Sequence, residues 1–223
     1  MQVTLQMHED VALIRMDDGK KNAITLDALA ALNACVDEAE TSAGAIVLAG
    51  RPGSFCAGFD IRVMTGDDRA ALNALSGGGA RFALRLYSLG MPLVAACTGH
   101  AFTIGAIWLA TCDTRIGERG AFQFGMVETA MGMTLPDWAL EPLQARLRNS
   151  HWLAAIAQSE IYAPDAALEA GFIDSLVDTG QAIDAALLKA AELAALPGKA
   201  YAGNKMARRG DALRRMEASL PVV

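Results

Sequence analysis

Glu128 is the residue whose surroundings best suit acid–base chemistry. It lies in residues 124–133, FGMVETAMGM, where every other residue except Thr129 is glycine or apolar. A carboxylate buried without a partner has a raised pKa, which brings it into the range useful for proton transfer near neutral pH. Two plainer interpretations stay open at this point. Glu128 could be an exposed residue at the start of a helix, or it could form a structural ion pair with an arginine such as Arg115.

Two glycine-containing turns could supply a second functional element. Gly58 and Gly105 lie in turns that each follow a predicted strand and open a predicted helix. The first backbone N–H groups of a helix have no partner within it, and the helix dipole is positive there. Two such groups converging on one carbonyl oxygen can stabilise an enolate or a tetrahedral oxyanion. Such turns are common in α/β proteins, so the spacing alone is weak evidence. We expect both turns and Glu128 to form one pocket.

The other reactive side chains form no recognisable site. His8 and His151 have no nucleophile or acid at a telling spacing, and His100 is more typical of a hydrogen-bonded core histidine than of a pocket residue. No GxSxG, GxxxxGK or GxGxxG motif is found, which disfavours a hydrolase triad and nucleotide binding. The cysteines show no CxxC spacing, so we expect buried thiols in a reducing compartment and no metal site. They are Cys35, Cys56, Cys97 and Cys112.

Composition narrows the class of protein. The 223 residues are 53% hydrophobic and 20% charged, which predicts a large core or a buried subunit interface. A net charge of −6 disfavours nucleic acid as a partner, because binding phosphates needs a basic surface. No segment resembles a signal peptide or a membrane span, so we expect a cytoplasmic protein with no membrane partner. The C-terminal segment is locally basic, which indicates either a solvated helix face or a site for a polyanion or an acidic neighbouring subunit. Its basic residues are Lys199, Lys205, Arg208, Arg209, Arg214 and Arg215.

Apolar patterning predicts strands that alternate with helices. Residues 3–7 and 11–16 predict a hairpin, and Thr25 is a predicted N-cap of an amphipathic helix that ends near residue 40. Apolar runs predict short strands at 45–49, 92–97, 113–116 and 122–124 and a buried helix at 103–111. Continuous apolar strands separated by helices predict an α/β fold with a parallel sheet.

The remaining segments are predicted from glycine, proline and helical patterning. The three glycines at 77–79 predict a mobile loop before a helical segment at 80–88. Beyond Pro136 we expect helices interrupted by one strand at 175–177 and punctuated at Pro164, Gly171, Pro197 and Gly203. We therefore expect a core over 1–155 that carries the site, and a helical region over 156–223 involved in oligomerisation.

Three motifs resemble the crotonase superfamily, the enoyl-CoA hydratases and isomerases. SFCAGFDIRVM at 54–64 resembles the family's FxAGxDI element, and VAACTGHAFTIGAIWLATCDTRI at 94–116 resembles its second glycine-rich element. KKNAITLDALAAL at 20–32 resembles the family's N-terminal helix entry. The resemblance implies a spiral of ββα units with a helical C-terminal region, assembled as homotrimers or dimers of trimers. It also implies an acyl-CoA substrate, with coenzyme A as part of that substrate and no permanently bound cofactor.

The resemblance also assigns residues by position. The backbone N–H groups of Phe59 and Ile104, with Gly105 as the alternative to Ile104, would form the oxyanion hole, and Glu128 would be the acid–base residue. The residues expected to contact substrate are Ala23, Ala57, Gly58, Asp60, Ile61 and Ile107. The candidates for the coenzyme A phosphates are Lys20, Lys21, Arg62 and Lys205, with Arg208 beside the last.

One departure from the family pattern points to a reaction. Hydratases carry a second glutamate where this chain has Ile107, and isoleucine can neither hold nor deprotonate water. Moving a double bond needs only one base, which takes a proton from C2 and returns it to C4. TCDTRI and GMTLPDWAL also look more like the Δ3,Δ2-enoyl-CoA isomerase branch. We therefore expect isomerisation, with three alternatives: a hydratase, another crotonase-type lyase or thioester hydrolase, or a non-catalytic acyl-CoA-binding subunit.

Overall fold

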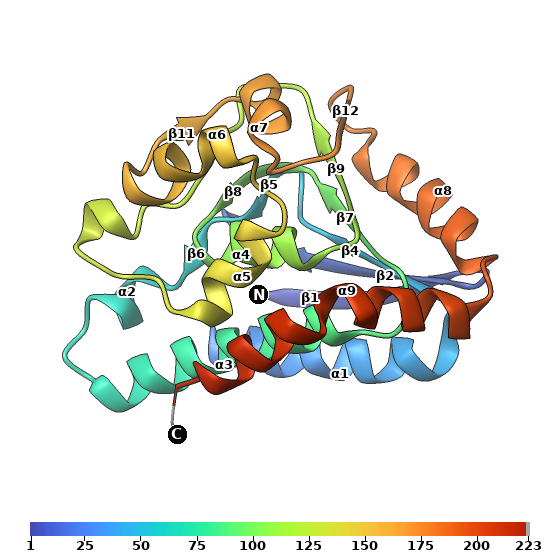
Figure 1. Ribbon diagram of the computed structural model, residues 1–223, viewed down its shortest axis with the longest axis horizontal. Coiled ribbons are helices and arrows are strands. Elements are labelled where there is room, and N and C mark those ends of the chain that lie inside the picture. Colours follow the sequence, from blue (N-terminus) through green and yellow to red (C-terminus); the bar gives the residue numbers. More distant parts are fainter. Residues whose placement is uncertain (222–223) are drawn as a thin grey trace.

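The protein, seen in a computed structural model that describes residues 1–221, is built around a six-stranded sheet (Figure 1). The strand order is β1-β2-β4-β7-β9-β12; only the β1–β2 pair is antiparallel. The strands are β1 (Gln2–His8), β2 (Val11–Asp17), β4 (Ala45–Ala49), β7 (Leu93–Cys97), β9 (Thr114–Glu118) and β12 (Ser175–Val177). The opening hairpin, the apolar parallel strands and the late strand at 175–177 are therefore confirmed.

A second, four-stranded sheet runs alongside in the order β11-β10-β8-β5. Its strands are β5 (Gly53–Cys56), β8 (Gly99–Phe102), β10 (Phe124–Gly125) and β11 (Ile161–Tyr162). Two further short strands, β3 (Ala23–Ile24) and β6 (Gly58–Phe59), pair with each other. Along the chain β4 is followed by β5, β7 by β8 and β9 by β10, so each turn of the spiral gives one strand to each sheet and then enters a helix. The predicted α/β spiral of ββα units is confirmed.

Helices cover both faces of the large sheet. Up to residue 131 the chain holds α1 (Leu26–Ser42), α2 (Ile61–Met64), α3 (Arg69–Ser88), α4 (Ile104–Thr111) and the 3-10 turn η1 (Thr129–Met131). The C-terminal half holds α5 (Asp137–Gln144), α6 (Asn149–Trp152), the π-helical turn η2 (Leu153–Ala157), α7 (Pro164–Ala170), α8 (Ala182–Ala194) and α9 (Gly198–Ala218). Helix α1 begins where predicted, because the Thr25 hydroxyl accepts a hydrogen bond from the Ala28 N–H.

The two faces of the sheet are buried differently. On one face of the sheet, Val47 and the residues beside it on neighbouring strands pack against the alanines of α8. On the opposite face, Ile46 and Leu48 point into the main core. That core lies between the sheets and the layer formed by α1, α3 and α9, which run along one side of the molecule (Figure 1). At its centre is α4, all of whose residues are buried.

Two expectations about glycines are wrong. Residues 77–79 form no loop: they lie in the middle of α3, and Gly77 and Gly79 are buried there. A Cβ on Gly79 would lie 2.4 Å from Cζ of Phe59, so glycine lets α3 pack closely against the motif at residues 54–64, which contains Phe59. Gly203 likewise lies inside α9 and interrupts nothing. None of the helices in residues 1–221 has the length and apolar character needed to cross a membrane.

Candidate active site

An apolar cavity of about 560 Å³ opens beside the two glycine-containing motifs. Aromatic and long apolar side chains dominate its walls, which come from both motifs, α2, α3, the segment around η1, the start of α5 and the end of α9. The lining residues are Ala57, Gly58, Phe59, Ile61, Met64, Ser76, Phe102, Thr103, Val127, Glu128, Met131, Met133, Thr134, Leu135, Pro136, Trp138, Ser219 and Pro221. Such a lining suits a ligand with a hydrocarbon part.

Glu128 is the only ionisable residue among the described residues that line this cavity. It directly precedes η1 and is 8% exposed, and its Oε2 atom is buried without a hydrogen-bond partner in the described part of the chain. Burial raises the pKa of Glu128 from 4.5 to about 7, and nearby backbone N–H groups offset only part of that rise. Such a carboxyl group can both accept and return a proton near neutral pH.

The plainer interpretations of Glu128 do not hold. The residue is buried, so it is not an exposed glutamate at a helix start. Arg115 pairs with Asp174 instead: its Nε donates to the Asp174 carboxylate at 3.0 Å. Because Glu128 is buried and forms no ion pair within residues 1–221, its carboxyl group is available to a molecule in the cavity.

The two glycine motifs pack directly against each other. Gly58 has φ +112°, and a Cβ there would lie 2.4 Å from the Thr103 hydroxyl oxygen. A Cβ on Gly105 would lie 2.5 Å from the carbonyl oxygen of Cys56. Because a side chain at either glycine would collide with the other motif, both positions require a residue without a Cβ. The pairing of β5 with β8 continues this contact between the motifs.

Thr103 places the start of α4 at the cavity. Its backbone has φ +50° and ψ −121°, an unfavourable region for a β-branched residue, and its side chain makes no capping hydrogen bond. The N–H groups of Ile104 and Gly105 follow in the first turn, where a helix offers no internal partner. Thr103 was not predicted from the sequence as a site residue, although a β-branched residue inside a glycine-rich run is a signal for it.

Asn22, also missed from the sequence, holds the first motif in place. It is fully buried with φ +57°. Its side-chain amide donates to the carbonyl oxygens of Met16, Ser54 and Phe55 at 3.0, 3.2 and 3.1 Å. Asn22 thereby ties β2 to β5, and β5 leads directly into Gly58.

The structure places the predicted substrate contacts in two groups. Ala57, Gly58, Phe59 and Ile61 line the cavity with Glu128. The others lie next to this wall: Ala23 pairs with Gly58, while Ile104, Gly105 and Ile107 are buried in α4. Asp60 is also buried, and its carboxylate caps α2 and pairs with Arg62, whose hydrogen bonds are the main cause of its lowered pKa. His100 does not line the cavity, and its Nδ1 accepts from the Gln123 N–H at 3.0 Å.

The basic residues expected to bind coenzyme A differ in their exposure to solvent. Lys20, Lys21 and Arg62 are exposed, and the Arg62 side chain is 86% exposed. Lys205 contradicts the expectation: its side chain is only 6% exposed, and its ammonium group lies 2.8 Å from Asp113 in a different cavity. An ammonium group held by a buried carboxylate is not available to a phosphate at the surface.

Comparisons with known proteins identify the family of this chain. The family model described as enoyl-CoA hydratase/isomerase matches residues 6–219. Human mitochondrial enoyl-CoA delta isomerase 1 is 28% identical over 85% of this chain, and the match spans 64% of its own length. The Bacillus subtilis "Probable enoyl-CoA hydratase" is 28% identical over 86% of this chain and 76% of its own. The crystal structure of an enoyl-CoA hydratase from Mycobacterium ulcerans superposes with a TM-score of 0.94 at 35% identity, covering 98% of this chain and 96% of that one. The chain belongs to the enoyl-CoA hydratase/isomerase family.

Proposed function

We propose that this protein moves the double bond of an enoyl-CoA from the 3 to the 2 position, with Glu128 as its single acid–base residue. The observation that carries the proposal is that Glu128 is the only ionisable residue among the described residues of the cavity wall. Its raised pKa, about 7, matches a group that must first accept a proton and then donate the same proton.

The proposed steps balance with one base. The Glu128 carboxylate removes a proton from C2 of the 3-enoyl thioester, and the negative charge spreads over a dienolate. The backbone N–H groups of Phe59 and of Ile104 or Gly105 donate hydrogen bonds to the dienolate oxygen. Losing one such donor typically reduces the rate by roughly 10²–10³-fold. The protonated Glu128 then delivers its proton to C4, which leaves the conjugated 2-enoyl thioester and the original carboxylate.

Ile107 supports isomerisation over hydration. Adding water requires a group that holds and deprotonates the water molecule, and the resemblance places that group at the position of Ile107. This side chain is 1% exposed and cannot exchange a proton. Coenzyme A enters as part of the substrate, with Lys20, Lys21 and Arg62 as the proposed partners of its phosphates. Arg62 pairs with Asp60, but unlike Lys205 its side chain is largely exposed, so a phosphate can still reach it.

The test is a product analysis of the wild-type protein. Incubation with a 3-enoyl and, separately, a 2-enoyl thioester, followed by chromatography, should give the 2-enoyl product from the first and little 3-hydroxyacyl product from the second. Glu128→Gln should lower the isomerisation rate by roughly 10²–10⁴-fold while it still binds a saturated acyl-CoA. Wild-type activity retained by Glu128→Gln would refute the assignment of the base.

Hydration is the second candidate, because relatives named as hydratases are as similar as the isomerase. Efficient conversion of the 2-enoyl substrate to a 3-hydroxyacyl product, with little isomerisation of the 3-enoyl substrate, would establish it in place of our proposal. Ile107→Glu restores the second carboxylate and should add some hydration activity to the isomerase. Folding of this variant must be measured first, because an unpaired buried carboxylate destabilises by a few kcal/mol or more.

We also propose a homotrimer or a dimer of trimers in the cytoplasm. The resemblance supports this assembly, and exposed apolar side chains such as Leu153 and Leu188, 63% and 71% exposed, are available to a subunit interface. The four cysteines are all free thiols, which suits a reducing compartment. Light scattering coupled to size-exclusion chromatography measures the assembly directly, and a monomer at micromolar concentration would refute it.

A further inference from the structure

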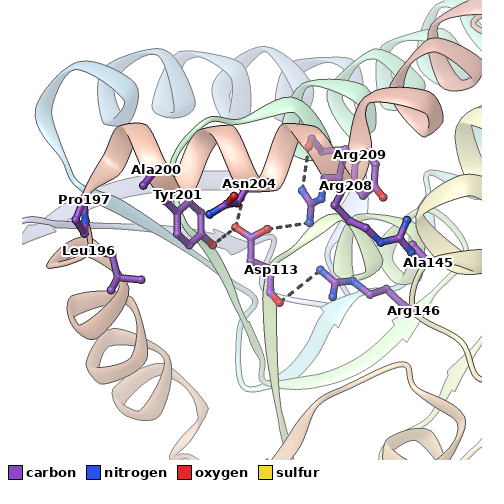
Figure 2. A pocket seen from close by; sticks show the side chains of 12 residues that line it. Asp113, Ala145, Arg146, Leu196, Pro197, Ala200, Tyr201, Asn204, Arg208 and Arg209 are labelled. Atoms are coloured by element: carbon purple, nitrogen blue, oxygen red, sulfur yellow. Dashed lines mark hydrogen bonds and ion pairs between the residues drawn. The ribbon is translucent and has the colours of Figure 1, made fainter.

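A second cavity, of about 570 Å³, lies where α9 crosses the end of α5 and the turn between α8 and α9. It shares no lining residue with the cavity at Glu128. Figure 2 shows Tyr201, Arg209 and Arg146 gathered around Asp113, with Arg208 beside them. Lys205 also lines it, so four cationic side chains surround one carboxylate.

Both oxygens of the Asp113 carboxylate accept hydrogen bonds from neighbouring residues of this chain. Its Oδ1 accepts from Arg209 at 2.8 Å. Its Oδ2 accepts from Lys205 at 2.8 Å and from the Tyr201 hydroxyl and the Leu93 N–H at 2.9 Å each. One negative charge is thus shared between two buried cations, and this cluster ties α9 to the start of β9.

The other two cations have no carboxylate partner within residues 1–221. Arg146 donates to the backbone carbonyl oxygens of Ala110 and Asp113, at 3.3 and 3.4 Å, and to that of Cys112. The Arg208 side chain, on the exposed side of α9, makes no hydrogen bond or ion pair with any described residue. The lining therefore carries three more positive than negative side chains, in a chain whose net charge is −6.

The surroundings leave this positive charge incompletely compensated. Burial is the main cause that lowers the pKa of both Lys205 and Arg209, despite their contact with Asp113. Helix α9 begins beside the cavity, with Pro197 and Ala200 in the wall, and no side chain of the described residues caps its N-terminus. The free N–H groups and the positive end of the dipole add to the same field.

We propose that this second cavity binds a phosphorylated small molecule, whose phosphoryl oxygens lie between Arg146 and Arg208. Guanidinium groups present paired donors that match phosphate oxygens, and no carboxylate in the described part of the chain holds either of these two. Leu196 and the Tyr201 ring offer an apolar wall to the rest of the ligand. Docking of α9 alone would explain Lys205 and Arg209, but not the unpartnered Arg208. The proposal is independent of the reaction at Glu128.

Pyrophosphate is a suitable probe, and calorimetric titration at low ionic strength measures its binding. The wild-type protein should give a saturable isotherm with one site per chain, weakened by added salt. Arg208→Glu should lower the affinity at least about tenfold. Arg208 is exposed, so this variant should fold, and a thermal unfolding curve checks that. Arg81→Glu is the matched control, since Arg81 is exposed on α3 outside this cavity; it should bind within about twofold of wild type.

Two results would overturn the proposal: no saturable binding by the wild type, or equal affinity in Arg208→Glu and the wild type. A further arm repeats the titration with saturating, unreactive acyl-CoA. Unchanged pyrophosphate affinity supports a separate site. Competition would mean that pyrophosphate occupies the coenzyme A site, which also overturns the proposal. Glu128→Gln should bind pyrophosphate as the wild type does, whatever reaction the first cavity performs.

Discussion

Glu128→Gln should change how the stability of the protein depends on pH. In the folded protein the pKa of Glu128 is about 7, against 4.5 for a free glutamate, because ionisation in the apolar cavity is unfavourable. At 1.36 kcal/mol per pKa unit, this difference amounts to about 3 kcal/mol of unfolding free energy. Glutamine keeps the shape of the side chain and carries no charge at any of these pH values, so the variant lacks this contribution.

The sign follows from which state holds the proton more tightly. The folded state does, so between pH 4.5 and 7 it binds a proton that the unfolded chain has lost. The contribution is fully present below pH 4.5 and is lost as the pH rises through 7. The unfolding free energy of the wild type should therefore fall by about 3 kcal/mol relative to Glu128→Gln between pH 4.5 and 8.

Urea unfolding of both proteins at pH 4.5, 6, 7 and 8 measures this difference, and subtracting the two curves cancels the other titrating groups. Glu38→Gln is the matched control: Glu38 is exposed on α1, and its replacement should leave the pH dependence unchanged. A difference between wild type and Glu128→Gln that stays constant over this range would show that Glu128 titrates as an exposed glutamate. The argument for a poised acid–base group would then be wrong.

Three further outcomes are expected. Because the proposed base has a pKa of about 7, kcat/KM for isomerisation should rise with pH through 7 and level off above pH 8, as a rate profile will show. Gly79→Ala would place its Cβ 2.4 Å from the Phe59 ring, so it should lower the activity and also the unfolding free energy, by about 1–3 kcal/mol as measured by urea unfolding. Gly203→Ala is its control: that position in α9 has open space around it, so the substitution should leave the unfolding free energy unchanged or raise it. Asp113→Asn leaves two buried cations without their carboxylate and should lower the unfolding free energy by about 3–5 kcal/mol, also measured in urea.

The sequence correctly predicted the elements that are determined by residues close to them in the chain, such as an apolar run or an N-cap residue. The apolar run at 45–49 has both faces buried, as a continuous apolar strand implies, because α8 covers the face opposite the main core. Thr25 caps α1 with its hydroxyl as its residue type suggested. In each case the information lay within a few residues of the element.

Prediction failed where a tertiary contact decided the outcome. Glycines at 77–79 indicate a loop by propensity, yet α3 runs through them because Gly79 must fit against the Phe59 ring. Its carbonyl oxygen also accepts from the Trp108 indole N–H at 3.3 Å. No window of sequence around residue 79 contains either partner.

The sequence predicted that both glycine-containing turns and Glu128 form one pocket, and Gly58, Thr103 and Glu128 do line one cavity, but it did not predict the contacts that position them. Residue types around Glu128 predicted a buried carboxylate, and its burial and raised pKa agree with that. The alternative partner, Arg115, was excluded only once its contact with Asp174 was seen. The contribution of Trp138 and Ser219 to the cavity wall also depends on packing between distant segments.

The basic C-terminal segment links the two cavities through one helix. In the middle of α9, Lys205 and Arg209 bind Asp113, and this fixes the helix against the core. At its end, the Ser219 hydroxyl accepts from the Trp138 N–H at 2.8 Å, and both residues line the cavity at Glu128. The distance from residue 205 to residue 218 is about 20 Å at the rise of an α-helix. None of the sequence interpretations of these lysines and arginines, a solvated face, a polyanion site or a site for an acidic neighbouring subunit, anticipated this role. Because a rigid helix transmits a shift at its middle to its end, loss of the Asp113 cluster should displace the wall of the cavity at Glu128 as well as destabilise the fold.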